Sequence, residues 1–243
     1  LYLNADTDSN GAGTLTVMAT KTINTNNGGI DITSWDIDLA GSLNSGTQST
    51  LIHSSKSAQS IMLGNFGNKD MTIKPDELQR ITASGLTVGG PQPSTLISQA
   101  VTAQSSQSVN EVVSLVVSKN GATANFQNKA STFKALNVQA DAAITVKKDV
   151  TTTSYGGMWL NADLDNTAEN GNSNELGFTD GRTLTSQQTL TLESRSNGII
   201  SAGSTTLKSG SGIVIAASME GAASNKRLYL NADTDSNGAG TLT

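Results

Sequence analysis

The sequence predicts an all-β fold, a parallel β-helix (β-solenoid) with about 20 residues per coil. Three observations lead to this prediction. The 243-residue chain contains 24 Gly but only 4% aromatic and 14% charged residues. Its apolar residues alternate with small polar ones in short runs bounded by Gly, Asn and Ser, a pattern typical of half-buried strands. The same sixteen residues, LYLNADTDSNGAGTLT, occur at 1–16 and again at 228–243.

Short runs with the alternation of a strand recur along the whole chain, whereas helical periodicity is almost absent. The segment PDELQRI at 75–81 predicts one or two helical turns at most, because Pro75 suits the first turn and Asp76 and Glu77 favour a helix N-terminus. The strand-like runs are 1–5, 14–19, 29–33, 60–63, 85–88, 94–98, 112–117, 135–138, 143–146, 158–162, 189–192, 213–216 and 228–232.

Self-similarity on two scales favours a solenoid over a β-sandwich. The sixteen-residue motif recurs after 227 residues, and MWLNADLD at 158–165 repeats its first half. The sequence therefore predicts one β-helical unit at 1–227 and the start of the next identical unit at 228–243. With about 20 residues per coil and strands about 4.8 Å apart, one period would make roughly 11 coils and a rod segment near 50 Å long.

The composition argues against a nucleic-acid partner, a membrane span and cysteine chemistry. The net charge is −5 and the 15 Lys and Arg are scattered, which argues against a nucleic-acid partner. No apolar stretch approaches the roughly 18 residues that cross a bilayer. The absence of cysteine excludes disulfides and thiolate metal sites. The composition favours an extracellular or cell-surface location.

One segment resembles a known family. Residues 61–90 read IMLGNFGNKDMTIKPDELQRITASGLTVGG. This segment resembles the repeats of filamentous-haemagglutinin-like exoproteins, in which an apolar-Leu-Gly strand precedes a DAEL-x-R-I segment and then GxLTIG. The resemblance implies a right-handed parallel β-helix in a long secreted or surface-attached fibrous protein, without catalytic residues. The matching residues are Ile61, Leu63, Gly64, Asp76, Glu77, Leu78, Arg80, Ile81, Leu86, Val88 and Gly89.

The repeated motif also contains D-x-D-x-N-G, the first half of a calcium-binding loop, whose alternate residues send oxygen ligands to one point. Position twelve of such a loop carries a bidentate Glu, but here it is Val17. Two interpretations stay open. The motif could bind calcium, the sole cofactor that the sequence suggests, or it could form a corner whose side chains accept hydrogen bonds from their own backbone. The candidate ligands are Asp6, Asp8 and Asn10, and in the second copy Asp233, Asp235 and Asn237.

Catalysis finds little support. His53 is the one histidine, it lies in a strand-like context, and no G-x-S-x-G elbow accompanies it. Asp36 and Asp38, beside Trp35, form the single close carboxylate pair next to an aromatic residue outside the repeated motif. Alternation would place both carboxylates on one strand face, and a solvated wall explains them equally well. The sequence therefore predicts a protein that is not an enzyme.

The resulting hypothesis is a structural protein: an extracellular β-solenoid filament or stalk built from tandem repeats, whose partner is the next repeat. The alternative is a surface adhesin that binds a glycan or a partner surface, for which the loop insertion at 164–181 is the expected binding face. Trp35, Trp159 and Tyr2 are interpreted as packing residues at coil edges or between rods, with sugar-stacking platforms as the alternative.

Overall fold

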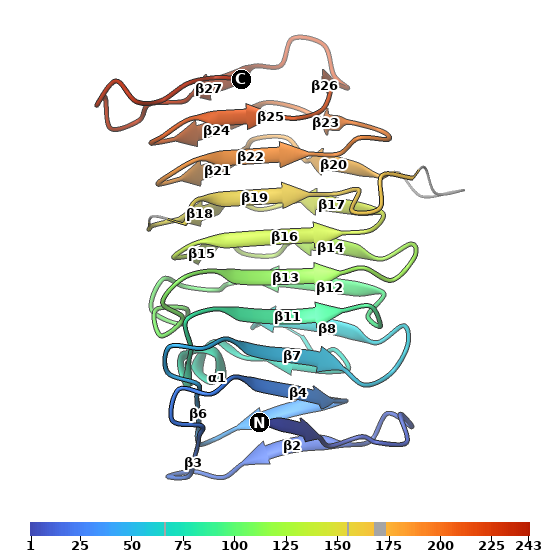
Figure 1. The fold of residues 1–243 in the computed structure, drawn as a ribbon. Coiled ribbons are helices and arrows are strands. Elements are labelled where there is room, and N and C mark those ends of the chain that lie inside the picture. The colour runs from blue at the N-terminus through green and yellow to red at the C-terminus, as the bar shows by residue number, and fades with distance from the viewer. Residues whose placement is uncertain (66, 155, 168–173) are drawn as a thin grey trace.

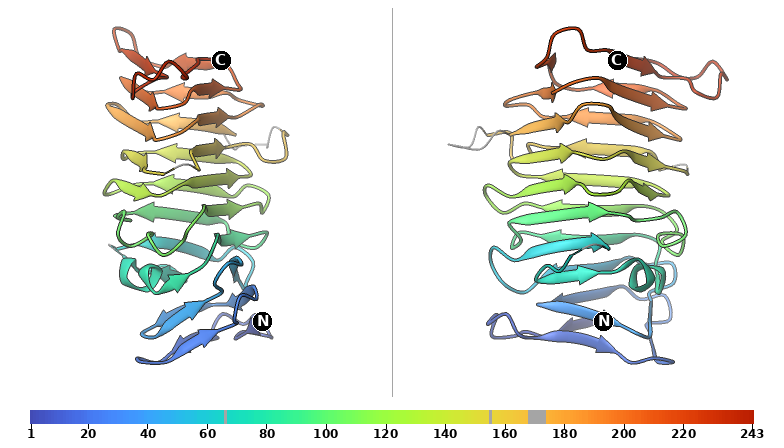
Figure 2. Two further views of the ribbon diagram at one scale, coloured as in Figure 1. Left: turned by 60° about the vertical axis from the view of Figure 1, so that its left-hand side comes forward. Right: turned by 180° about the vertical axis from the view of Figure 1, so that it is seen from behind.

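The chain winds into a parallel β-solenoid with three faces, shown from three sides in Figures 1 and 2. The structure is a computed structural model that describes residues 1–65, 67–154, 156–167 and 174–243. All strand pairings in this part of the chain are parallel. In Figure 1 the front strands run from left to right, the chain returns behind them, and each coil lies above the one before, so the coil is right-handed. The predicted fold class is confirmed.

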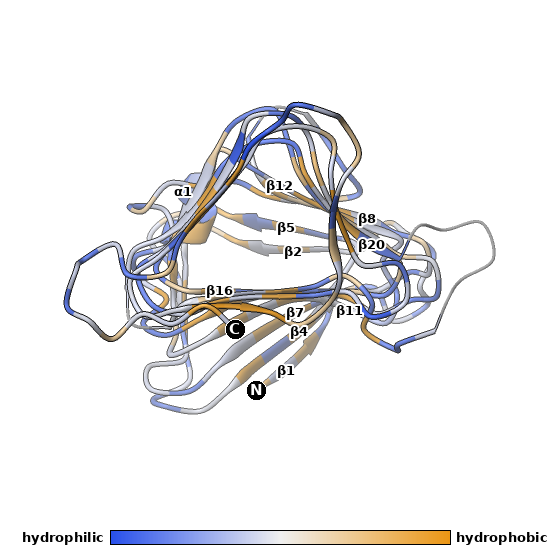
Figure 3. Ribbon diagram, turned by 90° about the horizontal axis from the view of Figure 1, so that it is seen from above, coloured by the Kyte–Doolittle hydropathy of each residue, from blue (hydrophilic) through white to orange (hydrophobic). Residues whose placement is uncertain are grey.

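Each coil crosses the three faces in the same order, and the view along the axis is a rounded triangle (Figure 3). Face 1 is one nine-stranded sheet. Its strands are β1 (Tyr2–Asn4), β4 (Ile30–Ser34), β7 (Thr50–Ser54), β11 (Leu86–Gly90), β13 (Val113–Val117), β16 (Leu136–Ala140), β19 (Met158–Asn161), β22 (Leu190–Glu193) and β25 (Ile213–Ile215).

Face 2 consists of a two-stranded sheet continued by an eight-stranded one. The pair is β2 (Thr14–Val17) and β5 (Asp36–Leu39). The larger sheet contains β9 (Met71–Ile73), β8 (Ser60–Gly64), β12 (Thr95–Gln99), β14 (Thr123–Phe126), β17 (Ala143–Val146), β20 (Glu175–Phe178), β23 (Ile199–Ser201) and β26 (Met219–Gly221).

Face 3 consists of a three-stranded and a five-stranded sheet. The first contains β3 (Thr22–Asn24), β6 (Ser42–Asn44) and β10 (Ile81–Thr82), and the second β15 (Ser131–Phe133), β18 (Val150–Thr152), β21 (Arg182–Ser186), β24 (Thr205–Ser209) and β27 (Leu228–Asn231). Helix α1 (Pro75–Gln79) precedes β10, with Pro75 in its first turn as expected. In the described part of the chain, no helix is long and apolar enough to span a membrane.

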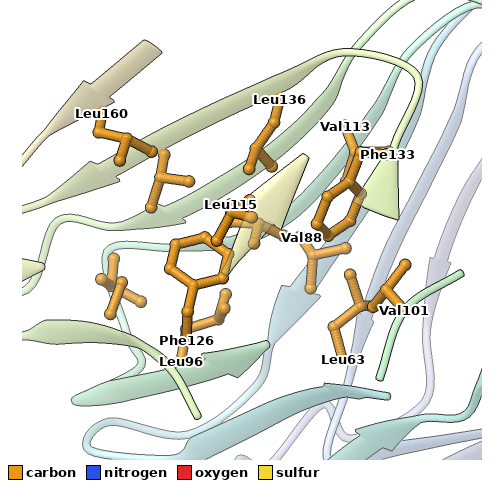
Figure 4. Close-up of a cluster of buried hydrophobic side chains, with 14 of the residues drawn as sticks. Leu63, Val88, Leu96, Val101, Val113, Leu115, Phe126, Phe133, Leu136 and Leu160 are labelled. Carbon is orange, nitrogen blue, oxygen red and sulfur yellow. The ribbon is translucent and has the colours of Figure 1, made fainter. Parts of the chain in front are cut away.

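The core is a set of aliphatic ladders that run along the axis. On face 1 the strand alternation points every second side chain inward, and the parallel register places these side chains above one another. Phe126 and Phe133 are fully buried among these aliphatic side chains (Figure 4). The central ladder of face 1 contains Leu3, Ile32, Ile52, Val88, Leu115, Val138, Leu160, Leu192 and Ile215.

Coil lengths vary more than the uniform value of about 20 residues expected from the sequence. Register partners Ile30 and Thr50 are 20 residues apart, whereas Thr50 and Leu86 are 36 apart. The long coil carries two additions, since β9 pairs with β8 of the same coil and α1 follows it. With nine strands on face 1, the chain makes fewer coils than the roughly 11 per period predicted.

Candidate functional site

The repeated motif forms a strand followed by a corner loop, residues 5–13 in the first copy. At the end of β1 the Asn4 Oδ1 atom accepts a hydrogen bond from the Asp6 backbone N–H (3.0 Å), which starts the turn. Ser9 then takes the left-handed conformation (φ 52°), and its N–H donates to the Asp6 carbonyl oxygen (3.1 Å). The Asp6 carboxylate closes the loop by accepting the Gly11 N–H (3.2 Å). The corner is thus built from short-range hydrogen bonds that the motif itself supplies.

In the first copy, later coils hold this corner loop in place. The Ser55 hydroxyl, which follows β7, donates to Asp6 Oδ2 (2.5 Å), and Asp6 is only 3% exposed. Lys56 Nζ donates to the Asn10 carbonyl oxygen (3.0 Å) and lies 5.7 Å from the centroid of the Trp35 ring. Because a single residue, Trp35, connects β4 to β5, the corner of the second coil is small enough for the loops of the first and third coils to touch. The corner therefore ties three coils together.

These contacts change the acidity of Asp6. The Ser55 hydroxyl is the main cause that lowers the pKa of the Asp6 carboxyl below its ordinary value of 3.8, burial opposes it, and the Gly11 N–H lowers it further. Asp6 is therefore held as a carboxylate, which strengthens the hydrogen bonds that it accepts.

The second copy reproduces the same corner on a different face. Asn231 Oδ1 accepts the Asp233 N–H (3.1 Å), Ser236 has φ 56°, and the Asp233 carboxylate accepts the Gly238 N–H (3.0 Å). However, β27 pairs with β24 on face 3, whereas β1 pairs with β4 on face 1. Thr241–Thr243 then lies beside β25 on face 1, whereas β2 lies on face 2. Identical residues of the two copies therefore lie on different faces of the prism, with the second copy displaced by one face.

The internal copy at 158–165 shows how the corner looks in the middle of the solenoid. Asn161 Oδ1 accepts the Asp163 N–H (3.1 Å), as in the other two copies. Asp163 is fully buried; it accepts the Ser196 N–H of the next coil (2.6 Å) and the Asn174 side-chain amide (3.2 Å). The broken continuation Glu169-Asn170-Gly171 lies outside the described residues.

The predicted calcium ligands lie together in each complete copy, but their carboxylate groups already accept hydrogen bonds. Asp8 accepts the backbone N–H (3.3 Å) and the side-chain amide (2.7 Å) of Asn10, and Asp235 and Asn237 repeat this arrangement. Among the described residues, no group of three or more His, Cys, Asp or Glu side chains could hold a metal ion. The geometry is that of the backbone-bonded corner, and calcium binding stays a prediction.

The other candidates from the sequence lie on the outer wall. His53 is half-buried on face 1, where its Nδ1 lies 2.9 Å from the Gly89 carbonyl oxygen and its Nε2 lies 3.5 Å from Asp31.

The sequence analysis missed Ser55 and Lys56, which contact the corner loop. No local pattern reveals a partner two coils away.

Asp36 and Asp38 lie on β5, but their surroundings differ. Asp36 is half-buried beside β9 and accepts the Thr72 N–H (2.9 Å), whereas Asp38 is exposed. Burial is the main cause that raises the pKa of Asp36 above 3.8. The two carboxylates therefore differ in environment, and the negative charge of Asp38 makes a small further contribution to the raised pKa of Asp36.

Comparisons of the chain with protein-family models, with curated proteins and with solved structures gave no match. The resemblance to filamentous-haemagglutinin-like repeats therefore stays a prediction.

Proposed function

We propose that this chain is a segment of an extracellular structural filament or stalk, in which one 227-residue period follows another in a continuous solenoid. The observation that carries the proposal is the repetition of the motif: the same sixteen residues form the same strand and corner at two levels of one prism. In both copies the central leucine, Leu3 or Leu230, points inward and pairs with a core residue of the neighbouring coil. A further period would extend the same ladders.

The surface of the terminal coils supports this proposal. All of the large apolar side chains that are exposed among the described residues lie in the first or the last coil: Leu1, Tyr2, Met18, Leu228, Tyr229 and Leu242. The outermost strands, such as β3 and β27, pair on one side only. Such unpaired edges are a liability for a free protein, and they suit a protein in which another coil covers them.

The position of the second copy gives the proposed filament a specific geometry. The first copy starts on face 1 and the second on face 3, eight full coils and two faces later. With strands about 4.8 Å apart, one period would rise about 42 Å. Each period would start one face out of step with the one before, and a feature of the surface would return to the same face after three periods.

A chain of two periods, residues 1–227 followed by 1–243, tests the filament. Solution scattering should give one rod about 42 Å longer than the single chain. Hydrogen exchange should protect the second LYLN strand more strongly than in the single chain, because coils then cover both its sides. Two bodies that tumble independently, with an unprotected junction, would contradict the proposal.

A surface adhesin is the second candidate, and a groove beside Trp159 favours it. The expected binding face at 164–181 lies partly outside the described residues, which omit 168–173, and its residues 175–178 form strand β20 on face 2, so the whole range is not a loop. The Trp159 groove lies at a different corner of the prism and is described below.

A further inference from the structure

A groove runs along the corner where face 3 meets face 1, on both sides of the Trp159 side chain. One hollow of about 560 Å³ lies toward the earlier coils and a second of about 220 Å³ toward the later ones. Both include Gly156 and Trp159. From β13 to β22 the strands advance by three steps, so the groove extends about 14 Å along the axis. The other described residues that line it are Asn110, Glu111, Val112, Leu136, Asn137 and Ser154 on one side, and Gly157, Met158, Gln188, Thr189 and Thr191 on the other.

The register of face 1 places an aromatic side chain next to an amide. Trp159 on β19 pairs with Asn137 on β16, and both side chains are on the outer surface of the sheet. The Asn137 Oδ1 atom is buried and has no hydrogen-bond partner among the described residues. Asn137 also lines the larger hollow, so its amide group borders the groove. A ligand that donates a hydrogen bond there would satisfy an atom that the protein leaves unpaired.

The charge of the groove limits the ligand. Among the described residues that line either hollow, Glu111 is the single charged one, and none is Lys or Arg. Phosphate, sulfate and carboxylate groups would therefore meet no counter-charge. A ligand with an apolar face for the indole and uncharged hydroxyl groups for the amides, Ser154, Thr191 and Glu111 fits this chemistry.

The sheet itself argues against a peptide. A peptide commonly binds a sheet by adding a strand to a free edge. Here β16, β19 and β22 are each paired on both sides, so face 1 offers no free edge within the groove. Recognition must use side chains that point outward, which suits a ring with alternating apolar and hydroxyl surfaces.

We propose that the groove around Trp159 binds a neutral oligosaccharide, with a pyranose ring stacked on the indole and its hydroxyl groups bonded to Asn137 and Glu111. This site deepens the adhesin candidate and rests on that candidate alone. A solenoid with an inactive groove would still form the filament, so the two proposals fail separately.

The experiment uses the two tryptophans of the chain as reporters. In a Trp35→Phe background, Trp159 is the single tryptophan, so the tryptophan emission reports on the groove alone. Cellotetraose, chitotetraose and maltotetraose are titrated at millimolar concentrations. Calorimetry measures the affinity of each. At least one neutral tetrasaccharide should bind and shift the emission of Trp159. In the otherwise native chain, Trp159→Ala should weaken that binding roughly tenfold, and Asn137→Ala should weaken it as well.

Tyr229→Ala is the matched control, because it removes an exposed aromatic side chain from the last coil, away from the groove. Its affinity should equal that of the native chain. Trp159→Phe, which keeps an aromatic ring, should retain part of the affinity, and circular dichroism should show that each variant stays folded. The proposal is wrong if no neutral tetrasaccharide binds, if folded Trp159→Ala binds as tightly as the native chain, or if a heparin-derived tetrasaccharide binds more tightly than all neutral probes.

Discussion

The two complete copies of the sixteen-residue motif show which properties of a solenoid corner are local and which depend on the neighbouring coils. Both copies make the same turn, with the same Asn-to-Asp and Asp-to-Gly hydrogen bonds. Their surroundings differ, because Ser55 and Lys56 hold the first corner, whereas Asp233 is bonded only within its own loop in the contacts that the structure shows. The turn is thus a property of the motif, and the face on which it lies depends on the coils between the copies.

The largest difference between copies should appear at the central leucine. Leu160 of the internal copy is fully buried between Val138 and Leu192, whereas Leu230 in the last coil is half-buried. We expect Leu160→Ala to lower the free energy of unfolding by about 3 kcal/mol because it leaves a cavity in the ladder. Leu230→Ala should cost about 1 kcal/mol or less, as its site is partly open. Urea denaturation measures both, and equal losses would show that the ends are as well packed as the centre.

Removal of the corner carboxylate should likewise cost more stability in the internal copy, at Asp163, than in the last coil, at Asp233. Asp163→Ala removes the partner of the Ser196 N–H and of the Asn174 amide inside the protein, and we expect a loss of about 2–3 kcal/mol. Asp233→Ala should change stability by less than about 0.5 kcal/mol, because its loop is at the surface. Thermal unfolding of the two variants compares them directly. A larger loss for Asp233→Ala would contradict the importance of the neighbouring coil.

Acid should reveal the contact between Asp6 and Ser55. The pKa of Asp6 is lowered in the folded state, so the stability that its charge contributes is complete above its ordinary value of 3.8 and is lost as the pH falls through the folded value. In Ser55→Ala the pKa of Asp6 should rise, and the acid transition should move to higher pH. Ser236→Ala, at the equivalent of Ser9 in the second copy, is the control. An unchanged acid transition in Ser55→Ala would show that the Ser55 hydroxyl contributes little.

Asp36 should show the opposite sign. Its pKa is raised by burial, so its charge destabilises the fold at neutral pH, and the penalty disappears as the pH falls through the folded value. Asp36→Asn should therefore raise the free energy of unfolding at pH 7 by less than about 1 kcal/mol, because solvent screens a half-buried group. The unfolding temperature should rise slightly as a result. The amide oxygen can still accept the Thr72 N–H. A loss of stability at pH 7 would show that the carboxylate is needed at this position.

Calcium should have the smallest effect on stability, because the corner oxygens already accept internal hydrogen bonds. We expect the unfolding temperature to change little between millimolar calcium and chelator. A clear rise with calcium that Asp8→Asn and Asp235→Asn together abolish would establish the predicted site instead. Magnesium at equal concentration controls for screening by divalent ions.

The sequence predicts the repeated corner and most strands of face 1, but it misses many strands of faces 2 and 3 and the arrangement of the coils. Alternation in LYLN and MWLN identifies strands, because a few consecutive residues are enough to show apolar and polar side chains on alternate faces. The helix at 75–79 was equally local, since Pro75 and two acidic residues mark its start. The contact of Asp6 with Ser55 could not be predicted in this way, because the residues are 49 positions apart and the coil lengths between them are irregular.

Several short strands escaped prediction because three residues show too little of the period of two. β9 (MTI) is a three-residue strand that pairs with β8 of its own coil and extends face 2 between β8 and β5. Together with α1, it makes that coil 36 residues long. A uniform coil of about 20 residues therefore overestimates the number of coils.

Cryo-electron microscopy of the two-period chain would show whether identical motifs start on different faces of one continuous solenoid. We expect a single rod in which the second period rises by about 42 Å and is turned by one face relative to the first. A rod whose second LYLN strand lies on face 1, directly in line with the first, or two separate bodies joined by a linker, would contradict it.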